Sequence, residues 1–181
     1  MGDNILGIVC ARTSSKRLPN KNIAEINGVP LVTIAKEKLE SLGIETVVIT
    51  NYEMPYDTVI RPDHLEGDDA SLQDVVLWYL REWTGELDDI DAIIVLMPTN
   101  PLIHEEDIEE AIYKYRNTGC NVVRSYDVNG EENGLYLIDY DYLLSNQYAY
   151  DVYTCSIYAD GIEIHNEDDL EFARRVLNES D

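Results

Sequence analysis

Short runs of branched apolar residues alternate along this chain with segments whose apolar residues recur at helical spacing. Residues 4–10 and 46–50 are typical of buried strands, and residues 31–42 between them have the pattern of an amphipathic helix. Pro30 suits the first turn of that helix, and Gly43 suits its C-terminal end. This order predicts a βαβ unit with parallel strands and a right-handed crossover.

The alternation continues through the rest of the chain. We expect helices over 68–83, 104–119 and 166–177, and strands over 92–97, 121–126 and 135–138. Asp68 or Asp69 is expected to cap the first of these helices. The tyrosine-rich segment 139–161 is expected to form a core edge rather than a base-stacking surface. Together the elements predict an α/β three-layer sandwich with a mostly parallel sheet, Rossmann-like in its layers.

Length and composition limit the functions that need to be considered. The chain has 181 residues, which predicts one domain, and 36 acidic against 13 basic residues give a net charge of −23. This charge disfavours nucleic acid and anionic lipid as partners. No apolar run has a membrane-spanning length, and the N-terminal segment resembles a first strand more than a signal peptide. We therefore expect a cytoplasmic protein whose three cysteines are reduced core thiols.

The loop after the first predicted strand is basic in an otherwise acidic chain. Residues 10–22 contain Arg12, Lys16, Arg17 and Lys21 and no acidic residue. Ligands of parallel α/β sheets bind beyond the carboxyl ends of the strands, which is where this loop begins. Cations and backbone N–H groups that converge there would bind a polyanion such as a triphosphate. The alternative is a solvated surface loop with no ligand.

The same loop carries a resemblance to a known family. ARTSSKRLPNKN, residues 11–22, resembles the first loop of the acylneuraminate cytidylyltransferases at Arg12, Ser15, Lys16, Leu18, Pro19, Lys21 and Asn22. Further matching positions occur along nearly the whole chain: Gly28, Pro30, Leu31, Arg61, Asp68, Ala70, Ser71, Pro98, Thr99, Pro101, Leu102, the NGLY motif at 133–136 and the segment 162–173. The resemblance implies a nucleotide-diphospho-sugar transferase-like fold that spans residues 1–181.

The resemblance also implies an activity. Enzymes of this family transfer CMP from CTP to a sialic-acid-like, nonulosonic sugar acid and release pyrophosphate. Arg12, Lys16 and Lys21 correspond to the cationic groups that act on the triphosphate. The implied nucleotide-binding residues are Ala11, Arg12, Ser15, Lys16, Lys21, Asn22, Arg61, Ser71, Pro98 and Thr99. The implied metal pair is Glu163 and His165, which would hold Mg²⁺ or Mn²⁺.

Three departures from the family pattern bear on this expectation. Glu163 and His165 replace two aspartates; residues two apart on a strand face the same side, but imidazole suits Mn²⁺ better than Mg²⁺, and His165 also fits an ordinary exposed histidine. Met97 and Ile103 replace a glutamine and an arginine that face the sugar acid, with Asn100 in place of a serine. The region 127–132 lacks most of the inserted segment that completes the sugar pocket and the dimer of the relatives, although an oligomer stays possible.

Three hypotheses remain open on the sequence alone. The first is a cytidylyltransferase or a nucleotidyltransferase with another small acceptor. The second is a nucleotide-binding homologue that has lost catalysis. The third is a scaffold that uses only the fold, because a fold does not determine a function.

Overall fold

The computed structural model describes residues 4–67, 69–82, 89–145, 154–159 and 161–179. A six-stranded sheet forms its centre, in the order β4-β1-β5-β7-β6-β8. The strands are β1 (Ile5–Ala11), β4 (Glu45–Thr50), β5 (Ala92–Leu96), β6 (Val122–Tyr126), β7 (Glu132–Asp139) and β8 (Thr154–Tyr158). Strands were expected at the first four of these positions and over part of β7, and the structure confirms them.

The sheet is mostly parallel, as the sequence predicts. β1 pairs in parallel with both β4 and β5, and β6 pairs in parallel with β8. Only β7 runs the other way, antiparallel to β5 and β6. The reason is the connection from β6 to β7, residues 127–131, which is too short for a crossover and closes a hairpin instead.

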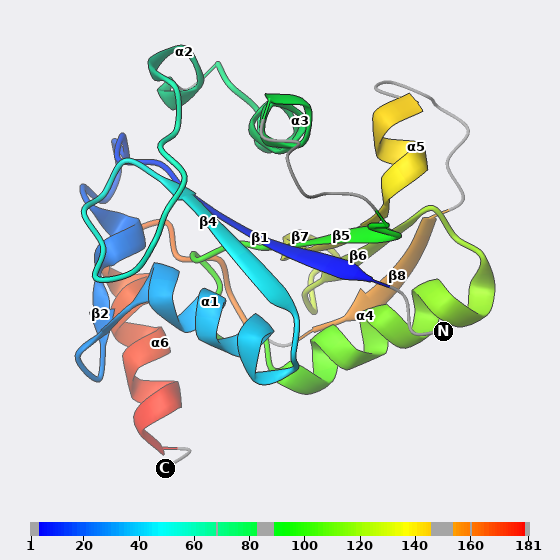
Figure 1. Ribbon diagram of the computed structural model, residues 1–181. Coiled ribbons are helices and arrows are strands. Elements are labelled where there is room, and N and C mark those ends of the chain that lie inside the picture. Colours follow the sequence, from blue (N-terminus) through cyan, green and yellow to red (C-terminus); the bar gives the residue numbers. More distant parts are fainter. Residues whose placement is uncertain (1–3, 68, 83–88, 146–153, 160, 180–181) are drawn as a thin grey trace.

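Helices cover both faces of the sheet and complete three layers (Figure 1). One face carries α1 (Leu31–Ser41) and α4 (Glu105–Thr118), and the other carries α3 (Leu72–Glu82) and α5 (Tyr140–Ser145). The remaining elements lie near the carboxyl ends of the parallel strands: η1 (Lys21–Ile23), the hairpin of β2 (Glu25–Ile26) and β3 (Val29–Pro30), α2 (Asp63–Glu66) and α6 (Glu167–Glu179).

The core follows from the alternation of side chains along the strands. Val9 packs in the cluster that faces α1 and α4, whereas its neighbour Ile8 packs in the cluster that contains α3 residues. Both faces of the central strands are therefore apolar, which is why β1 reads as a continuous hydrophobic run.

The start of α3 corrects the predicted cap. The helix begins at Leu72, and Ser71 precedes it. The Ser71 hydroxyl accepts a hydrogen bond from the Asp74 backbone N–H at 3.1 Å, while the Asp74 carboxylate accepts one from the Ser71 N–H at 2.9 Å. This reciprocal capping box satisfies the exposed N–H groups of the first turn, so Asp69 is not the cap. Asp68 lies outside the described residues.

The three cysteines are free thiols, and Cys10 and Cys120 are buried. This agrees with the expected reduced core thiols. Within the described part of the chain, no helix combines the length and the hydropathy that crossing a membrane requires.

Candidate nucleotide-binding site

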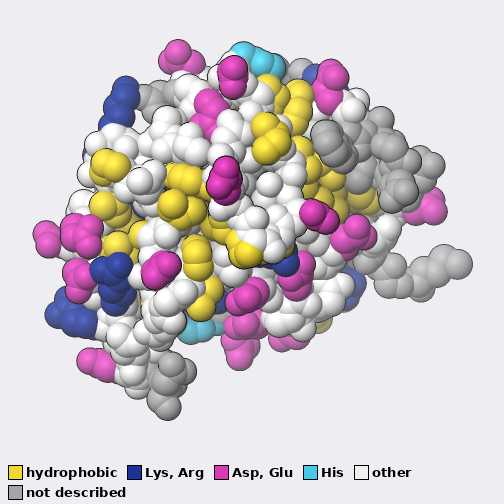
Figure 2. All heavy atoms as spheres, turned by 60° about the vertical axis from the view of Figure 1, so that its left-hand side comes forward, with side chains coloured by type: hydrophobic (Ala, Val, Ile, Leu, Met, Phe, Trp, Pro, Cys, Tyr) yellow, Lys and Arg dark blue, Asp and Glu magenta, His cyan; other side chains and the backbone are white. Residues whose placement is uncertain are grey.

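A pocket of about 170 Å³ lies at the carboxyl ends of β1 and β5. Figure 2 views the molecule from the side on which these strands end. Carboxyl ends of parallel strands meet at one edge, and the loops that leave them surround a common space. The lining residues are Cys10, Arg12, Lys21, Asn22, Arg61, Ala70, Leu72, Val75, Met97, Thr99 and Glu163.

The basic loop folds back on itself, which brings its two ends to the pocket. The buried Asn22 donates a hydrogen bond from Nδ2 to the carbonyl oxygen of Arg12 at 2.9 Å. Asn20 takes a left-handed backbone conformation just before the 3₁₀ turn η1. Arg12 and Lys21 consequently both line the pocket, whereas Lys16 and Arg17 lie exposed in the outer part of the loop.

Helix α2 holds the outer part of the loop. Thr13 donates two hydrogen bonds, from its backbone N–H and its hydroxyl, to Oε2 of Glu66, each at 3.3 Å. Ser14 donates from its hydroxyl to the Glu66 carbonyl oxygen at 2.7 Å. These contacts leave the loop cations free to turn toward the strand ends instead of pairing with Glu66.

Lys21 is a cation under electrostatic stress. Burial lowers the pKa of its ammonium group, and Arg17 and Arg12 lower it further, while Glu163 and Asp169 oppose the shift. Its Nζ donates a hydrogen bond to the carbonyl oxygen of Ile164 at 2.8 Å. An anion in the pocket would favour the protonated amine, because an opposite charge stabilises the charged form.

Arg61 adds a third cation to the pocket wall. Its side chain is buried and donates from Nε to the carbonyl oxygen of Leu65 at 2.6 Å. Burial lowers its pKa, and the nearby Arg12 lowers it further. One edge of the guanidinium is therefore used to hold α2, and the group also adds positive charge to the pocket.

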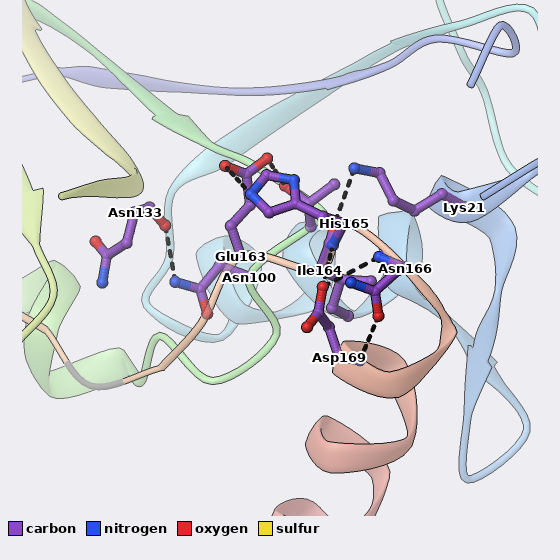
Figure 3. A network of polar contacts seen from close by, with 9 residues as sticks. Lys21, Asn100, Asn133, Glu163, Ile164, His165, Asn166 and Asp169 are labelled. Carbon is purple, nitrogen blue, oxygen red and sulfur yellow. Dashed lines mark hydrogen bonds and ion pairs between the residues drawn. The ribbon is translucent and has the colours of Figure 1, made fainter. Parts of the chain in front are cut away.

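Glu163 and His165 lie close together beside the pocket (Figure 3). Oε2 of Glu163 is 3.7 Å from Nε2 of His165, and Oε1 of Glu163 accepts a hydrogen bond from the Thr99 hydroxyl at 3.1 Å. The segment 161–165 is not a strand, contrary to the strand geometry expected for it. It is held instead by the hydrogen bond from the Ile164 N–H to the Thr99 carbonyl oxygen at 2.7 Å.

This pair fits a divalent cation. Neighbouring ligands that each lie about 2 Å from an octahedral ion are about 3 Å apart, so a small rotamer change brings both side chains onto one ion. No cluster of three or more Asp, Glu, His or Cys side chains occurs among the described residues, so the protein alone offers two ligands. The remaining positions suit phosphate oxygens and water.

The structure gathers some of the predicted site residues at the pocket and places others elsewhere. Among the described residues, those that line it and were predicted are Arg12, Lys21, Asn22, Arg61, Thr99 and Glu163. Ala11 and Pro98 are buried, Ser15 is half-buried, Lys16 is exposed, and Ser71 caps α3. The ligand roles assigned to all of these residues stay predictions.

The expectation of an apolar acceptor wall needs a correction. Met97 does line the pocket, but Ile103 is fully buried in the core cluster on the α1 and α4 face. Asn100 is also buried, and its Nδ2 donates to the carbonyl oxygen of Asn133 at 2.8 Å. The turn after β5 reverses the chain at Asn100, which carries Ile103 behind the sheet rather than over the pocket.

Sequence reasoning missed several apolar lining residues. Cys10 lies one residue before the end of β1 and faces α3, while Leu72 and Val75 line the pocket from the start of α3. The strand alternation is a signal that could have found Cys10, since every second residue of β1 faces that side. Burial raises the pKa of the Cys10 thiol to about 12, so it is a neutral wall residue and not a nucleophile.

Relatives of known name resemble this chain in sequence. A synthase of CMP-N,N'-diacetyllegionaminic acid from Legionella pneumophila is 30% identical over 130 residues, which are 66% of this chain and 56% of the relative. The N-acylneuraminate cytidylyltransferase of Escherichia coli O18:K1:H7 is 30% identical over 126 residues, which are 64% of this chain and 29% of the relative. The chain thus spans about half the length, or less, of these relatives.

The fold recurs in solved structures. A CMP:2-keto-3-deoxy-manno-octonic acid synthetase complexed with CTP superposes with a TM-score of 0.74, at 17% identity, over 98% of this chain and 100% of the other. This likeness establishes the nucleotidyltransferase-like three-layer α/β fold. The sequence pattern of the cytidylyltransferase family matches residues 6–175, and the chain therefore belongs to that family.

Proposed function

We propose that this protein transfers CMP from CTP to a sugar acid and releases pyrophosphate. The observation that carries the proposal is the pocket itself, in which Arg12, Lys21 and Arg61 face a space bordered by Glu163. A pocket with three cations in a chain of net charge −23 suits a small polyanion. Family membership and the CMP-sugar acids in the relatives' names point to CTP and a nonulosonic or octulosonic acid.

The triphosphate would bind against the basic loop. Arg12 and Lys21 are within the pocket, and Lys16, exposed in the same loop, can fold over the outer phosphates. Asn22 fixes the loop through the Arg12 carbonyl. The loop thereby presents cations already positioned for the negative charge that builds up in phosphoryl transfer. Ala11, Ser15, Ser71, Pro98 and Thr99 complete the proposed nucleotide-contacting set.

The chemistry is one displacement at phosphorus. The anomeric hydroxyl oxygen of the acceptor forms a bond to the α-phosphorus, the bond from that phosphorus to the bridging oxygen breaks, and pyrophosphate leaves with the electron pair. The hydroxyl proton passes to solvent. Arg12 and Lys21 stabilise the added negative charge of the transition state and of the leaving pyrophosphate.

A divalent metal completes the proposal, and its ligands would be Glu163 and His165. The ion would supply charge neutralisation at phosphate oxygens. The mixed carboxylate and imidazole pair favours Mn²⁺ over Mg²⁺, since Mg²⁺ prefers oxygen ligands. A protein of this fold from Mycobacterium tuberculosis, at 10% identity, has been solved with manganese. Thr99 orients the carboxylate through its hydroxyl.

We place this activity in the cytoplasm, where CTP is available and where free thiols such as those of Cys10, Cys120 and Cys155 stay reduced.

Pyrophosphate release tests the proposal. The protein is incubated with CTP, Mn²⁺ or Mg²⁺, and each of N-acetylneuraminic acid, N,N'-diacetyllegionaminic acid and 2-keto-3-deoxy-manno-octonic acid. We expect release that depends on CTP, metal and one of these acids. Tight CTP binding with no turnover on any acid would assign the chain to nucleotide binding without catalysis. No binding of any ribonucleoside triphosphate would overturn both readings.

A further inference from the structure

Arg124 is a basic side chain on the same sheet face as the pocket, yet it is not among the pocket's lining residues. It lies in the middle of β6, directly opposite Tyr136 of β7, which in turn lies opposite Val95 of β5. Val95 and Tyr136 pack in the same cluster as the pocket residue Cys10. Neighbouring strands are about 4.8 Å apart, so Arg124 lies roughly 10 Å from β5, within reach of a ligand that extends out of the pocket.

The guanidinium of Arg124 is only partly satisfied. Its Nη1 donates to Oε1 of Glu132 at 2.6 Å. Its Nε is buried and donates to no atom of the described residues, although the side chain as a whole is 40% exposed. A buried N–H group without an acceptor is costly, and a ligand oxygen would remove that cost. The planar guanidinium matches a carboxylate, which can accept two parallel hydrogen bonds.

The neighbours of Arg124 suit the rest of a sugar acid. Burial, together with the Glu132 and Glu163 carboxylates, raises the pKa of Tyr136 to about 12, so its phenol stays a hydrogen-bond donor. Tyr126 follows two residues after Arg124 on the same face, and Tyr158 of β8 lies directly opposite it. Aromatic rings with polar tips bind the mixed apolar and hydroxyl surface of a sugar ring.

The hairpin between β6 and β7 leaves this surface open. Residues 127–131 form a tight turn in which the Asp127 carboxylate accepts hydrogen bonds from the backbone N–H groups of Asn129 at 2.8 Å and Glu131 at 2.9 Å. The turn satisfies its own polar groups, and the Arg124 side chain stays accessible beside it.

We propose that Arg124 binds the carboxylate of the acceptor and thereby selects a sugar acid over a neutral sugar. In the absence of acceptor, Glu132 holds the guanidinium in position by the Nη1 contact. The acid then bonds to Nε and to the guanidinium edge that Glu132 leaves available. The identity of the acceptor as a sugar acid rests on the proposed function.

Arg124→Gln tests the inference, with Arg116→Gln as the matched control. Arg116 is exposed on α4, which covers the opposite face of the sheet. Loss of a charge-assisted contact should raise the KM for the acid roughly ten- to hundredfold, with a smaller change in kcat. Arg116→Gln should leave both constants unchanged. Arg124→Lys, which keeps the charge but not the fork, should give an intermediate KM.

The acceptor itself can be varied in parallel. The methyl ester of the acid should bind the wild-type protein as weakly as the acid binds Arg124→Gln, and the ester should bind both proteins equally. Glu132→Gln should lower the KM for the acid, because it removes a carboxylate that competes for the guanidinium. A purely structural role for Arg124 predicts instead that Glu132→Gln and Arg124→Gln both weaken acid and ester alike, and this pattern would overturn the inference.

Direct titration separates this inference from the proposed function. Each acid of the panel is titrated by calorimetry into wild-type and Arg124→Gln protein, with CTP titrated separately. Acid binding that Arg124→Gln abolishes while CTP binding is unchanged supports the carboxylate site, even where no pyrophosphate forms. Equal acid binding by both proteins, or no acid binding by the wild type, overturns it whether or not CTP binds.

Discussion

Lys21 donates a hydrogen bond from Nζ to the carbonyl oxygen of Ile164 at 2.8 Å, which joins the basic loop to the segment that carries Glu163 and His165. The two proposed halves of the triphosphate site are therefore in direct contact before any ligand binds. The partners are 143 positions apart in the sequence, so no local pattern announces this contact.

Replacement of Lys21 by alanine should weaken the binding of CTP. A charge-assisted contact to phosphate is worth about 1.5–3 kcal/mol, so calorimetry should show a Kd increased roughly ten- to hundredfold. Lys36→Ala is the control, because Lys36 pairs with Glu40 on the surface of α1 and also carries one positive charge. An equal loss in both variants would show that overall charge, and not the position of Lys21, determines affinity.

The affinity for CTP should fall with rising pH earlier than an ordinary lysine would predict. Burial and the neighbouring arginines lower the pKa of Lys21, and only its protonated form attracts phosphate. The free protein therefore loses this charge at a pH below 10.5, the usual value for lysine, and affinity declines through that window. Metal-free titrations between about pH 7.5 and 10 measure it. Lys21→Arg should flatten the decline, and an unchanged pH profile in that variant would contradict this account.

Glu163→Gln should weaken the binding of Mn²⁺ in the presence of CTP. The substitution removes the one anionic ligand of the pair but keeps an oxygen that can accept the Thr99 hydroxyl, so the segment stays in place. We expect at least a tenfold increase in the Kd for Mn²⁺, measured by electron paramagnetic resonance of the free ion. Glu167→Gln, on the exposed first turn of α6, is the control. Unchanged Mn²⁺ affinity in Glu163→Gln would remove the pair as a metal site.

The capping box of α3 should contribute measurably to stability. Ser71→Ala and Asp74→Ala each remove one side of the reciprocal contact, and each should lower the free energy of unfolding by about 1 kcal/mol. Because both substitutions break the same box, the double variant should lose less than the two single losses combined. Urea unfolding of the four proteins measures the coupling, and full additivity would argue against it.

The sequence predicted the central strands and most helices because their apolar patterns are strong and local. β1 and β5 are buried on both sides and read as unbroken apolar runs, and α1 and α4 end at Gly43 and Gly119, where the backbone takes positive φ values. The basic loop could be placed at the pocket because it directly follows β1.

Other features depend on contacts between distant residues, which a single sequence does not reveal. β8 comes from the tyrosine-rich segment and exists because it can pair with β6 at the sheet edge. The burial of Ile103 follows from the turn at Asn100, whose side chain bonds to Asn133. The partly satisfied guanidinium of Arg124 was likewise invisible, since it depends on the register between β6 and β7.

Gly134 should be irreplaceable at the junction of β7 with the pocket. Its φ is +101°, and a Cβ atom there would lie 2.8 Å from Cβ of Met97, which lines the pocket. Gly130 is the matched control, because its φ is +79° but an added Cβ would meet nothing within 4 Å. Gly130→Ala should therefore cost only the backbone strain, about 1 kcal/mol, whereas Gly134→Ala should cost roughly 2–4 kcal/mol because it adds the clash. Unfolding in urea compares the two, and because the clash displaces Met97, Gly134→Ala should also weaken CTP binding. Equal losses of stability in the two variants would mean that β7 can move away from Met97 at little cost.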